Sequence, residues 1–435
     1  MSVADSKSAL PLPSSEHECK SIEKETPKAE WTQDAAPDGG LTAWLVALGA
    51  WCSLFCTFGW INSVGVFQSY YETELLSQYS SSTIAWIPSL QIFFMFAMGP
   101  IVGQLYDKFG PRYLILGGSF LHVFGLMMAS ISKEYYQVLL SQGVCSAMGT
   151  CAIFQPSMTS IPSWFNKKRG AAYGIVATGS SLGGVIFPIM VSKLMDKVGY
   201  GWTMRTAAFM ILALLVVANL TVRSRVPPKP RTMSKETLLK PFREIKMLLV
   251  IGGFLCLTFG IFVPINYLVV EAMEAGMSTY LANYLVAMLN AASLFGRILA
   301  GISSDKLGHY NILVVACLLA GILVLALWVP ATSNAAIIVF ACTFGFASGA
   351  YVSLANALVV KISPFPEIGY RTGLLFLFSS IGGLTANPIA GAILQHENGS
   401  YTGMKIFAGI FLLAGSLWVM AARFVHTGFD LKAKF

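Results

Sequence analysis

The chain alternates between long apolar runs and short polar segments from residue 43 to residue 425. Each apolar run is long enough for a helix to cross the roughly 30 Å of hydrocarbon in a bilayer. The runs are apolar throughout, whereas a strand of a membrane barrel alternates polar and apolar side chains over about ten residues. The pattern therefore predicts an all-α integral membrane protein with twelve transmembrane helices, near residues 43–66, 84–105, 113–131, 136–158, 171–192, 203–222, 247–270, 280–301, 311–329, 335–360, 372–394 and 402–425.

Two of the polar segments repeat the same residues at a distance of 198 positions. Segments 103–110 (GQLYDKFG) and 301–308 (GISSDKLG) share glycine, aspartate, lysine and glycine at identical spacing. A repeat of this kind between apolar runs is typical of duplicated membrane transporters, so we expect two six-helix bundles. The predicted organisation is a disordered cytosolic tail at 1–40, an N-terminal bundle at 41–222, a basic cytosolic linker at 223–246, a C-terminal bundle at 247–425 and a cytosolic tail at 426–435.

The composition is that of a protein whose surface faces lipid. The chain is 55% hydrophobic and 11% charged, whereas ordinary soluble domains are about 25% charged. The net charge of +8 follows the membrane topology, so we expect no nucleic-acid partner. The cysteines show no CxxC pair and no metal-ligand spacing. We therefore expect neither a metal ion nor a cofactor.

Lysine and arginine residues beyond the tail gather on one set of alternate loops, which includes the KKR cluster at 167–169 and the 223–246 linker. The positive-inside rule places these loops in the cytosol. We therefore predict a multi-pass protein of the plasma membrane with both termini in the cytosol. The linker either attracts anionic lipid or serves only as a topology determinant between the bundles.

A second repeat lies inside two apolar runs, where residues 180–184 (SSLGG) recur as 379–383 (SSIGG). Small residues allow helices to approach closely in lipid. Residues 179–183 also fit GxSxG, but a nucleophile elbow requires a strand-to-helix turn, and this segment lies in an apolar helix. The chain has no GxxxxGK[ST] segment for binding ATP. We therefore expect a non-enzymatic protein that does not pump by hydrolysing ATP.

Segment 103–112 (GQLYDKFGPR) resembles the signature loop between spans two and three of the major facilitator superfamily, and segment 301–308 is its weaker copy after span eight. The aspartate of such a loop can accept hydrogen bonds at a helix N-terminus. The resemblance implies that the loop stabilises one gating state, and that Asp305 matters less because its segment lacks a residue matching Arg112. The gating residues predicted in this way are Gly103, Asp107, Lys108, Gly110, Arg112 and Asp305.

Two further segments resemble motifs of the monocarboxylate-porter family, in particular its fungal members. Segment 38–44 (DGGLTAW) resembles the acid-Gly-Gly-aromatic entry to span one, with one residue extra before the tryptophan. Segment 164–174 (WFNKKRGAAYG) resembles the aromatic-basic-Ala-x-Gly entry to span five. The resemblance implies a transporter of small molecules that works as a monomer in the lipid bilayer.

Proton-coupled animal porters carry a lysine in span one and an aspartate and an arginine in span eight, and the matching positions here are Asn62, Ser293 and Arg297. Arg297 either extends to the headgroups or faces a central cavity and binds an anionic group. The central His122 either packs with satisfied hydrogen bonds or handles a proton. The predicted substrate-binding residues are Arg297, Asn62, Asn266, Asn290 and Asn356, although each asparagine can instead bridge two helices.

The expected function is the movement, as efflux, of a small organic acid or secondary metabolite by alternating access. Uptake of a monocarboxylate or vitamin-like substrate, by facilitated diffusion or proton symport, is the near alternative, and a non-transporting nutrient sensor is the distant one. Every Asp and Glu beyond the tail lies in a predicted loop or at a helix end. We therefore expect flux driven mainly by the gradient of the substrate.

Overall fold

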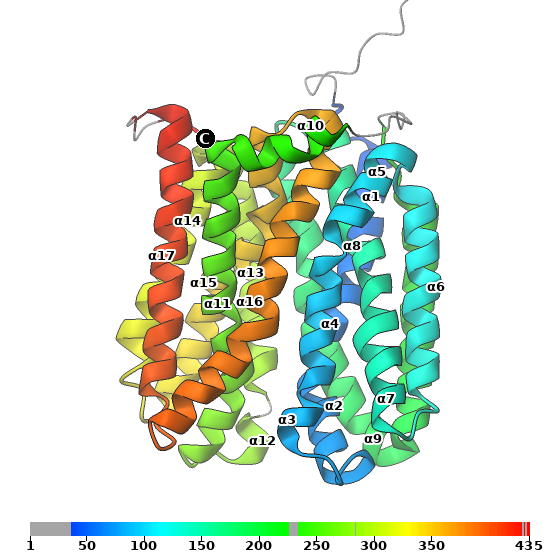
Figure 1. Cartoon of the computed structure of the whole chain (residues 1–435), viewed down its shortest axis with the longest axis vertical. Helices are drawn as coiled ribbons and strands as arrows, with labels where there is room; N and C mark the ends of the chain where they lie inside the picture. Colours follow the sequence, from blue (N-terminus) through cyan, green and yellow to red (C-terminus); the bar gives the residue numbers. More distant parts are fainter. Residues whose placement is uncertain (1–35, 226–233, 283, 429, 431–432) are drawn as a thin grey trace, which may run out of the picture. The chain divides into compact units, whose positions relative to one another are not determined.

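A computed structural model describes residues 36–225, 234–282, 284–428, 430 and 433–435 (Figure 1). These residues form helices and connecting turns, and no strand occurs among them. The disordered tail predicted at 1–40 falls almost entirely outside this range, as does the middle of the predicted linker. The first helices are α1 (Leu41–Leu54), η2 (Phe55–Gly59), α2 (Val64–Tyr70), η3 (Tyr71–Leu75), α3 (Ser81–Ile84), α4 (Trp86–Ala97), α5 (Gly99–Phe109), α6 (Pro111–Ala129), α7 (Tyr135–Val138), η4 (Leu139–Ser146), α8 (Ala147–Ser160), η5 (Ile161–Ser163) and α9 (Arg169–Thr221).

The remaining helices begin within the predicted linker and continue through the second half. Segment η2, like η3, η4 and η7, is a π-helical part of a longer helix, and η5, η6 and η8 are 3₁₀ turns. The second series is α10 (Lys235–Leu239), η6 (Lys240–Arg243), α11 (Ile245–Glu274), α12 (Thr279–Ala282), α13 (Leu285–Leu307), α14 (His309–Leu323), η7 (Val324–Trp328), α15 (Asn334–Ile362), η8 (Phe365–Glu367), α16 (Ile368–His396) and α17 (Thr402–Thr427).

Eleven continuous helical stretches among the described residues are long and apolar enough to cross a membrane. One of them, α9, has 53 residues, and Gly199 within it has φ 74° and ψ 171°. This left-handed φ ends a helix and favours glycine. Helix α9 is therefore two spans joined at Gly199, which confirms the prediction of twelve transmembrane helices.

The first span is interrupted rather than continuous. After η2 the backbone makes a turn at Asn62 and Ser63, whose amides donate to the carbonyl oxygens of Gly59 and Trp60. Helix α2 begins only at Val64. Irregular backbone at membrane depth is tolerated where protein buries it, and at this turn Ser63 is buried while Asn62 is half-buried.

The two repeated segments end in the same kind of turn. Gly110 has φ 76° and lies between α5 and α6, and Gly308 has φ 100° and lies between α13 and α14. Glycine adopts such angles without the steric cost that a Cβ would bring. We call the end of the helices at which these turns lie the motif end; α10 lies there too, whereas α2, α3 and α12 lie at the opposite end (Figure 1).

The most extensive packing between the first six spans and the last six occurs at two places. Helices α4 and α5 pack on α16, and α9 packs on α13. Glycines bring both pairs together: a Cβ on Gly99 would lie 2.6 Å from the Gly373 oxygen, and a Cβ on Gly174 would lie 2.6 Å from the Arg297 oxygen. These distances are too short for any side chain, so the halves touch backbone to backbone.

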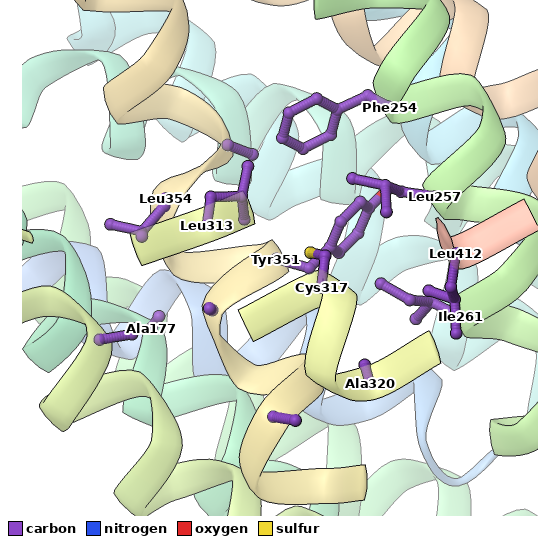
Figure 2. Packing of buried hydrophobic residues seen from close by; sticks show 14 of the residues in the cluster. Ala177, Phe254, Leu257, Ile261, Leu313, Cys317, Ala320, Tyr351, Leu354 and Leu412 are labelled. Carbon is purple, nitrogen blue, oxygen red and sulfur yellow. The ribbon is translucent and has the colours of Figure 1, made fainter. Parts of the chain in front are cut away.

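The main hydrophobic core crosses from one half to the other. Figure 2 shows part of it, in which Ala177 of α9 belongs to the same cluster as Phe254, Cys317, Tyr351 and Leu412 of the second half. A second cluster, which contains Trp60, Phe67 and Tyr200, lies within the first half.

Candidate gate and substrate site

Asp107 joins the two halves at the motif end. Its Oδ1 accepts a hydrogen bond from the Gly369 amide at 3.0 Å, and its Oδ2 accepts one from the Tyr370 amide at 2.9 Å. These amides belong to the first turn of α16, where backbone N–H groups have no partner within the helix. A carboxylate from the other half therefore caps α16 and interacts favourably with its dipole.

Asp305 makes the matching contact in the second repeat. It accepts hydrogen bonds from the amides of Gly170 at 2.6 Å and Ala171 at 2.9 Å, in the first turn of α9. The two aspartates thus cap two helices across two equivalent interfaces. Because each aspartate accepts two amide hydrogen bonds, these contacts do not explain why Asp305 would contribute less than Asp107 to holding the halves together.

Gln155 of α8 makes a contact between the halves that the sequence did not predict. Its Nε2 donates to the Gly369 oxygen at 2.9 Å, and its side chain is buried. Gly103 lies at the same point, since a Cβ there would be 2.8 Å from Gln155 Nε2. A lone glutamine in an apolar run carries no signal of such a contact.

The other predicted gating residues lie beside the interface. Lys108 lies over the ring of Phe109, 5.0 Å from its centroid, and Arg112 is exposed at the start of α6. Neither side chain makes a hydrogen bond or ion pair across the halves within the described part of the chain. Gly110 contributes its positive φ. Of the residues predicted for the gate, the structure brings Asp107 and Gly103 to the opposite half, with Asp305 at the second interface.

The end of the linker is bound to α16. Arg371 is fully buried, and its Nη1 and Nη2 donate to Glu244 at 2.5 and 2.8 Å while its Nε donates to Glu367 at 2.9 Å. The hydrogen bonds and charge of Arg371 lower the pKa of Glu244 from its ordinary value. Tyr370 also donates through its hydroxyl to the Leu238 oxygen. This part of the linker is therefore attached to the helix that Asp107 caps.

The two motifs that resemble the porter family contact each other. The Oδ1 atom of Asp38 accepts hydrogen bonds from the amides of Asn166 at 2.7 Å and Lys168 at 3.1 Å. The rings of Trp44 and Phe165 pack edge to face at 5.2 Å. These contacts hold the loop before α9, and with it the helix end that Asp305 caps.

Arg297 does not extend to the headgroups. Its side chain is 7% exposed and points to the other half, where Nη1 donates to the Ala177 oxygen at 2.6 Å and to the Ser180 hydroxyl. Its Nε donates to Ser293 on its own helix at 3.2 Å. A buried cation is costly unless it is paired or hydrogen-bonded, and here α9 provides the partners.

Asn62 and Asn290 also meet across the halves. The Nδ2 atom of Asn290 donates to Asn62 Oδ1 at 3.3 Å, and Asn62 Nδ2 donates to the Phe58 oxygen at 2.8 Å. Both amides lie against Gly184, where a Cβ would come within 2.9 Å of each. Since Asn290 and Arg297 lie two turns apart on α13, about 10 Å of helix, one helix presents both to the first half.

The remaining predicted residues lie elsewhere in the second half. Asn266 is exposed, and its Nδ2 donates to Asn387 Oδ1 at 3.0 Å. Asn356 is 2% exposed, and neither atom of its amide has a hydrogen-bond partner among the described residues. The structure therefore brings Arg297, Asn62 and Asn290 to the contact between halves, but shows no contact linking Asn266 or Asn356 to them.

His122 packs inside the first half. Its Nδ1 lies 2.8 Å from the Ser146 hydroxyl, and its Nε2 lies 3.1 Å from the Cys56 oxygen. Both ring nitrogens are thus occupied, which favours the packing role.

The second half contains a buried ion pair that the sequence did not predict. Glu271 lies near the end of α11 and pairs with Lys405 of α17, while Trp328 donates to the same carboxylate at 2.5 Å. The Lys405 ammonium also donates to the Trp328 oxygen at 3.0 Å. These groups satisfy one another and tie three helices together away from the interface between halves.

Two surface hollows, of about 470 and 420 Å³, lie away from these residues. Tyr70, Lys133, Tyr200 and Arg205 line the first, and apolar side chains around Phe295 line the second. No predicted substrate residue lines either one. In this conformation Arg297 is enclosed between the halves.

Comparison with known proteins agrees with this architecture. A model of the Major Facilitator Superfamily matches residues 44–344. The chain is 63% identical to the MFS transporter asaE of Aspergillus flavus, over 95% of this chain and 94% of that protein. It is 53% identical to the Fujikurins efflux protein of Gibberella fujikuroi, over 91% of this chain and 85% of that protein.

A solved structure of the transporter FucP in the outward conformation has a TM-score of 0.69 and 16% identity, over 87% of this chain and 99% of that one. That likeness establishes a shared fold. Twelve spans, a duplicated signature turn and helix contacts between the halves define a membrane carrier built from two related bundles. The chain belongs to the Major Facilitator Superfamily.

Proposed function

We propose that this protein exports a small organic acid or secondary metabolite by alternating access of its two halves. Support comes from a relative named as an efflux protein for fujikurins, which is 53% identical over 91% of this chain. Export of such a compound needs a carrier that binds an amphipathic anion and releases it on the other side. The fungal monocarboxylate-porter motifs fit the same class of carrier.

The observation that carries the proposal is the position of Arg297. Its guanidinium is held by α9 of the opposite half, at Ala177 and Ser180. When the halves separate at the motif end, these hydrogen bonds break and the donors of Arg297 become available. An anionic substrate then supplies the partners that a buried cation requires. Substrate binding and the contact between halves thus compete for one side chain.

The distribution of basic residues supports a motif end that faces the cytosol. In this orientation the conformation described above is closed to the cytosol by Asp107 and Asp305, and is the one that releases an exported substrate. Both termini are then cytosolic. We assign the carrier to the plasma membrane, where it acts as a monomer, since each chain contains both halves.

Metabolite profiling tests the proposal. Organic acids would be measured in cells and medium of a strain that lacks the gene, and again after restoring the wild type or an Arg297→Ala variant of equal abundance. We expect the substrate to accumulate inside cells lacking the gene, and wild type but not Arg297→Ala to return it to the medium. Unchanged distributions would refute export, and depletion inside the cells would identify an importer.

A further inference from the structure

Four phenylalanine side chains form a closed set of ring contacts between the halves. Phe58 of η2, Phe96 of α4 and Phe154 of α8 come from the first half, and Phe376 of α16 comes from the second. The ring centroids are 5.9 Å apart for 58–96, 4.8 Å for 58–154, 5.0 Å for 154–376 and 5.3 Å for 96–376. Each ring therefore touches two others, and we call this set the phenylalanine quartet.

The quartet lies just beyond the closest approach of the halves. Phe96 precedes Gly99 by three residues and Phe376 follows Gly373 by three, and these two glycines touch. Given the directions of α4 and α16, the rings lie about one helical turn from that crossing, on the side away from the motif end. The quartet also adjoins Asn62, whose amide donates to the Phe58 oxygen.

The internal repeat places the quartet and Arg297 at equivalent positions in the two interfaces. Gly373 and Gly174 are matching glycines of α16 and α9, as are Gly369 and Gly170, so Phe376 corresponds to Ala177. The Ala177 oxygen is an acceptor for Arg297. One interface thus presents aromatic rings at the depth where the other presents a cation.

This pairing defines a complementary ligand. A planar conjugated ring packs on phenylalanine through offset or edge-to-face contacts that a saturated ring cannot reproduce. A carboxylate or enolate matches the planar donor fork of a guanidinium. When the halves separate, Phe376 moves away from Phe96 and Phe154, and a flat ring can insert between Phe376 and these two rings.

We propose that the substrate is a planar, conjugated organic acid whose ring packs on the phenylalanine quartet while Arg297 holds its anionic group. This inference rests on the proposed function, because it names the substrate class of the same site. A quartet that served only as a hydrophobic seal would affect leakage but would not discriminate between flat and saturated acids.

Binding of two acids with the same carbon skeleton tests the inference. The full-length protein in nanodiscs would be titrated by calorimetry with 2-naphthoate and with its fully saturated analogue, decahydro-2-naphthoate. We expect wild type to bind the flat acid about tenfold more tightly, the ratio that two lost aromatic contacts allow. Phe376→Leu should bring the ratio close to one, and Arg297→Gln should weaken binding of both acids alike.

The matched control is Phe378→Leu, because Phe378 lies on the same helix but packs on Phe242 outside the quartet. It should keep the wild-type ratio. Phe96→Leu changes the quartet from the other half and should reproduce the effect of Phe376→Leu, so that a folding defect in one variant does not decide the result.

Equal affinities in wild type, or an equal loss of the ratio in Phe378→Leu, would overturn the inference. If both acids bound with equal affinity and Arg297→Gln weakened that binding, the planar substrate class would be wrong, but the proposed export of an organic acid would stand. Failure of 2-naphthoate to bind would also overturn the substrate class, and the metabolite profiling would then judge export separately.

Discussion

Removal of the Asp107 carboxylate should open the motif end. Asp107→Ala deletes two hydrogen bonds, of 3.0 and 2.9 Å, to the first turn of α16. Loss of a capping side chain costs about 0.5–2 kcal/mol, and loss of a negative charge at a helix N-terminus adds about 0.3–1 kcal/mol. With part of this recovered by water, the closed state should lose about 1–2 kcal/mol. The population open at the motif end then rises about five- to thirtyfold.

Cys151 provides a natural reporter for this change. It is 1% exposed on α8, one turn before Gln155, which donates to the Gly369 oxygen of the other half. In a variant that retains Cys151 as its only cysteine, the rate of labelling by a membrane-permeant maleimide follows the open population. We expect Asp107→Ala to raise the labelling rate about five- to thirtyfold, because destabilising the closed state by about 1–2 kcal/mol raises the open population by that factor.

Asp305→Ala should raise the rate by a similar factor, because its hydrogen bonds match those of Asp107. Lys108→Ala is the matched control, since Lys108 lies on the same turn, packs over Phe109 and makes no hydrogen bond or ion pair to the other half among the described residues. Wild-type labelling rates in Asp107→Ala at normal abundance would refute the capping argument. A rise with Asp107→Ala alone would restore the unequal roles that the sequence predicts.

Three further predictions concern charge, topology and coupling. Arg297→Ala should abolish or severely weaken transport in a flux assay, and Arg297→Lys should rescue it only in part because an ammonium lacks the planar donor fork; full activity of Arg297→Ala would contradict a substrate role. Tags at residues 1 and 435 should stay inaccessible to an impermeant label on intact cells, and labelling of either tag would reverse the orientation. Residues 398–400 (NGS) form a glycosylation sequon in the short connection between α16 and α17, and because this connection lies close to the membrane, Asn398 should show little glycosylation. In proteoliposomes an imposed pH gradient should not drive uphill accumulation, because the buried Glu271 is held by Lys405; robust accumulation would show proton coupling.

The spans were predictable because each is encoded locally. The apolar run predicted at 247–270 is α11 at Ile245–Glu274, and the break predicted between residues 192 and 203 falls at Gly199. Length and hydropathy suffice for such elements, since lipid imposes them span by span. The turn at Asn62 was not predicted. Packing against other helices offsets the free-energy cost of interrupting this span, and the local sequence does not reveal those contacts.

The sequence alone pointed to a site residue only where that type of residue is rarely stable within a membrane span. A lone arginine in a span has to find partners, so Arg297 stood out. Gln155 and the four phenylalanines did not, because glutamine and phenylalanine are common in apolar helices and their role arises from contacts between distant segments. The substrate-binding roles predicted for Arg297 and the four asparagines all remain predictions.

The duplication distinguishes residues that the two halves share from residues that differ between them. Asp107 and Asp305 are identical in the two halves and cap equivalent helices, so they can serve a symmetric exchange between conformations. The position of Arg297 is glycine in the first half, at Gly99, and the position of Phe376 is alanine, at Ala177. Together these two differences leave one interface cationic and the other aromatic. A substrate that bridges the two interfaces therefore needs unlike ends, and an amphipathic acid has them.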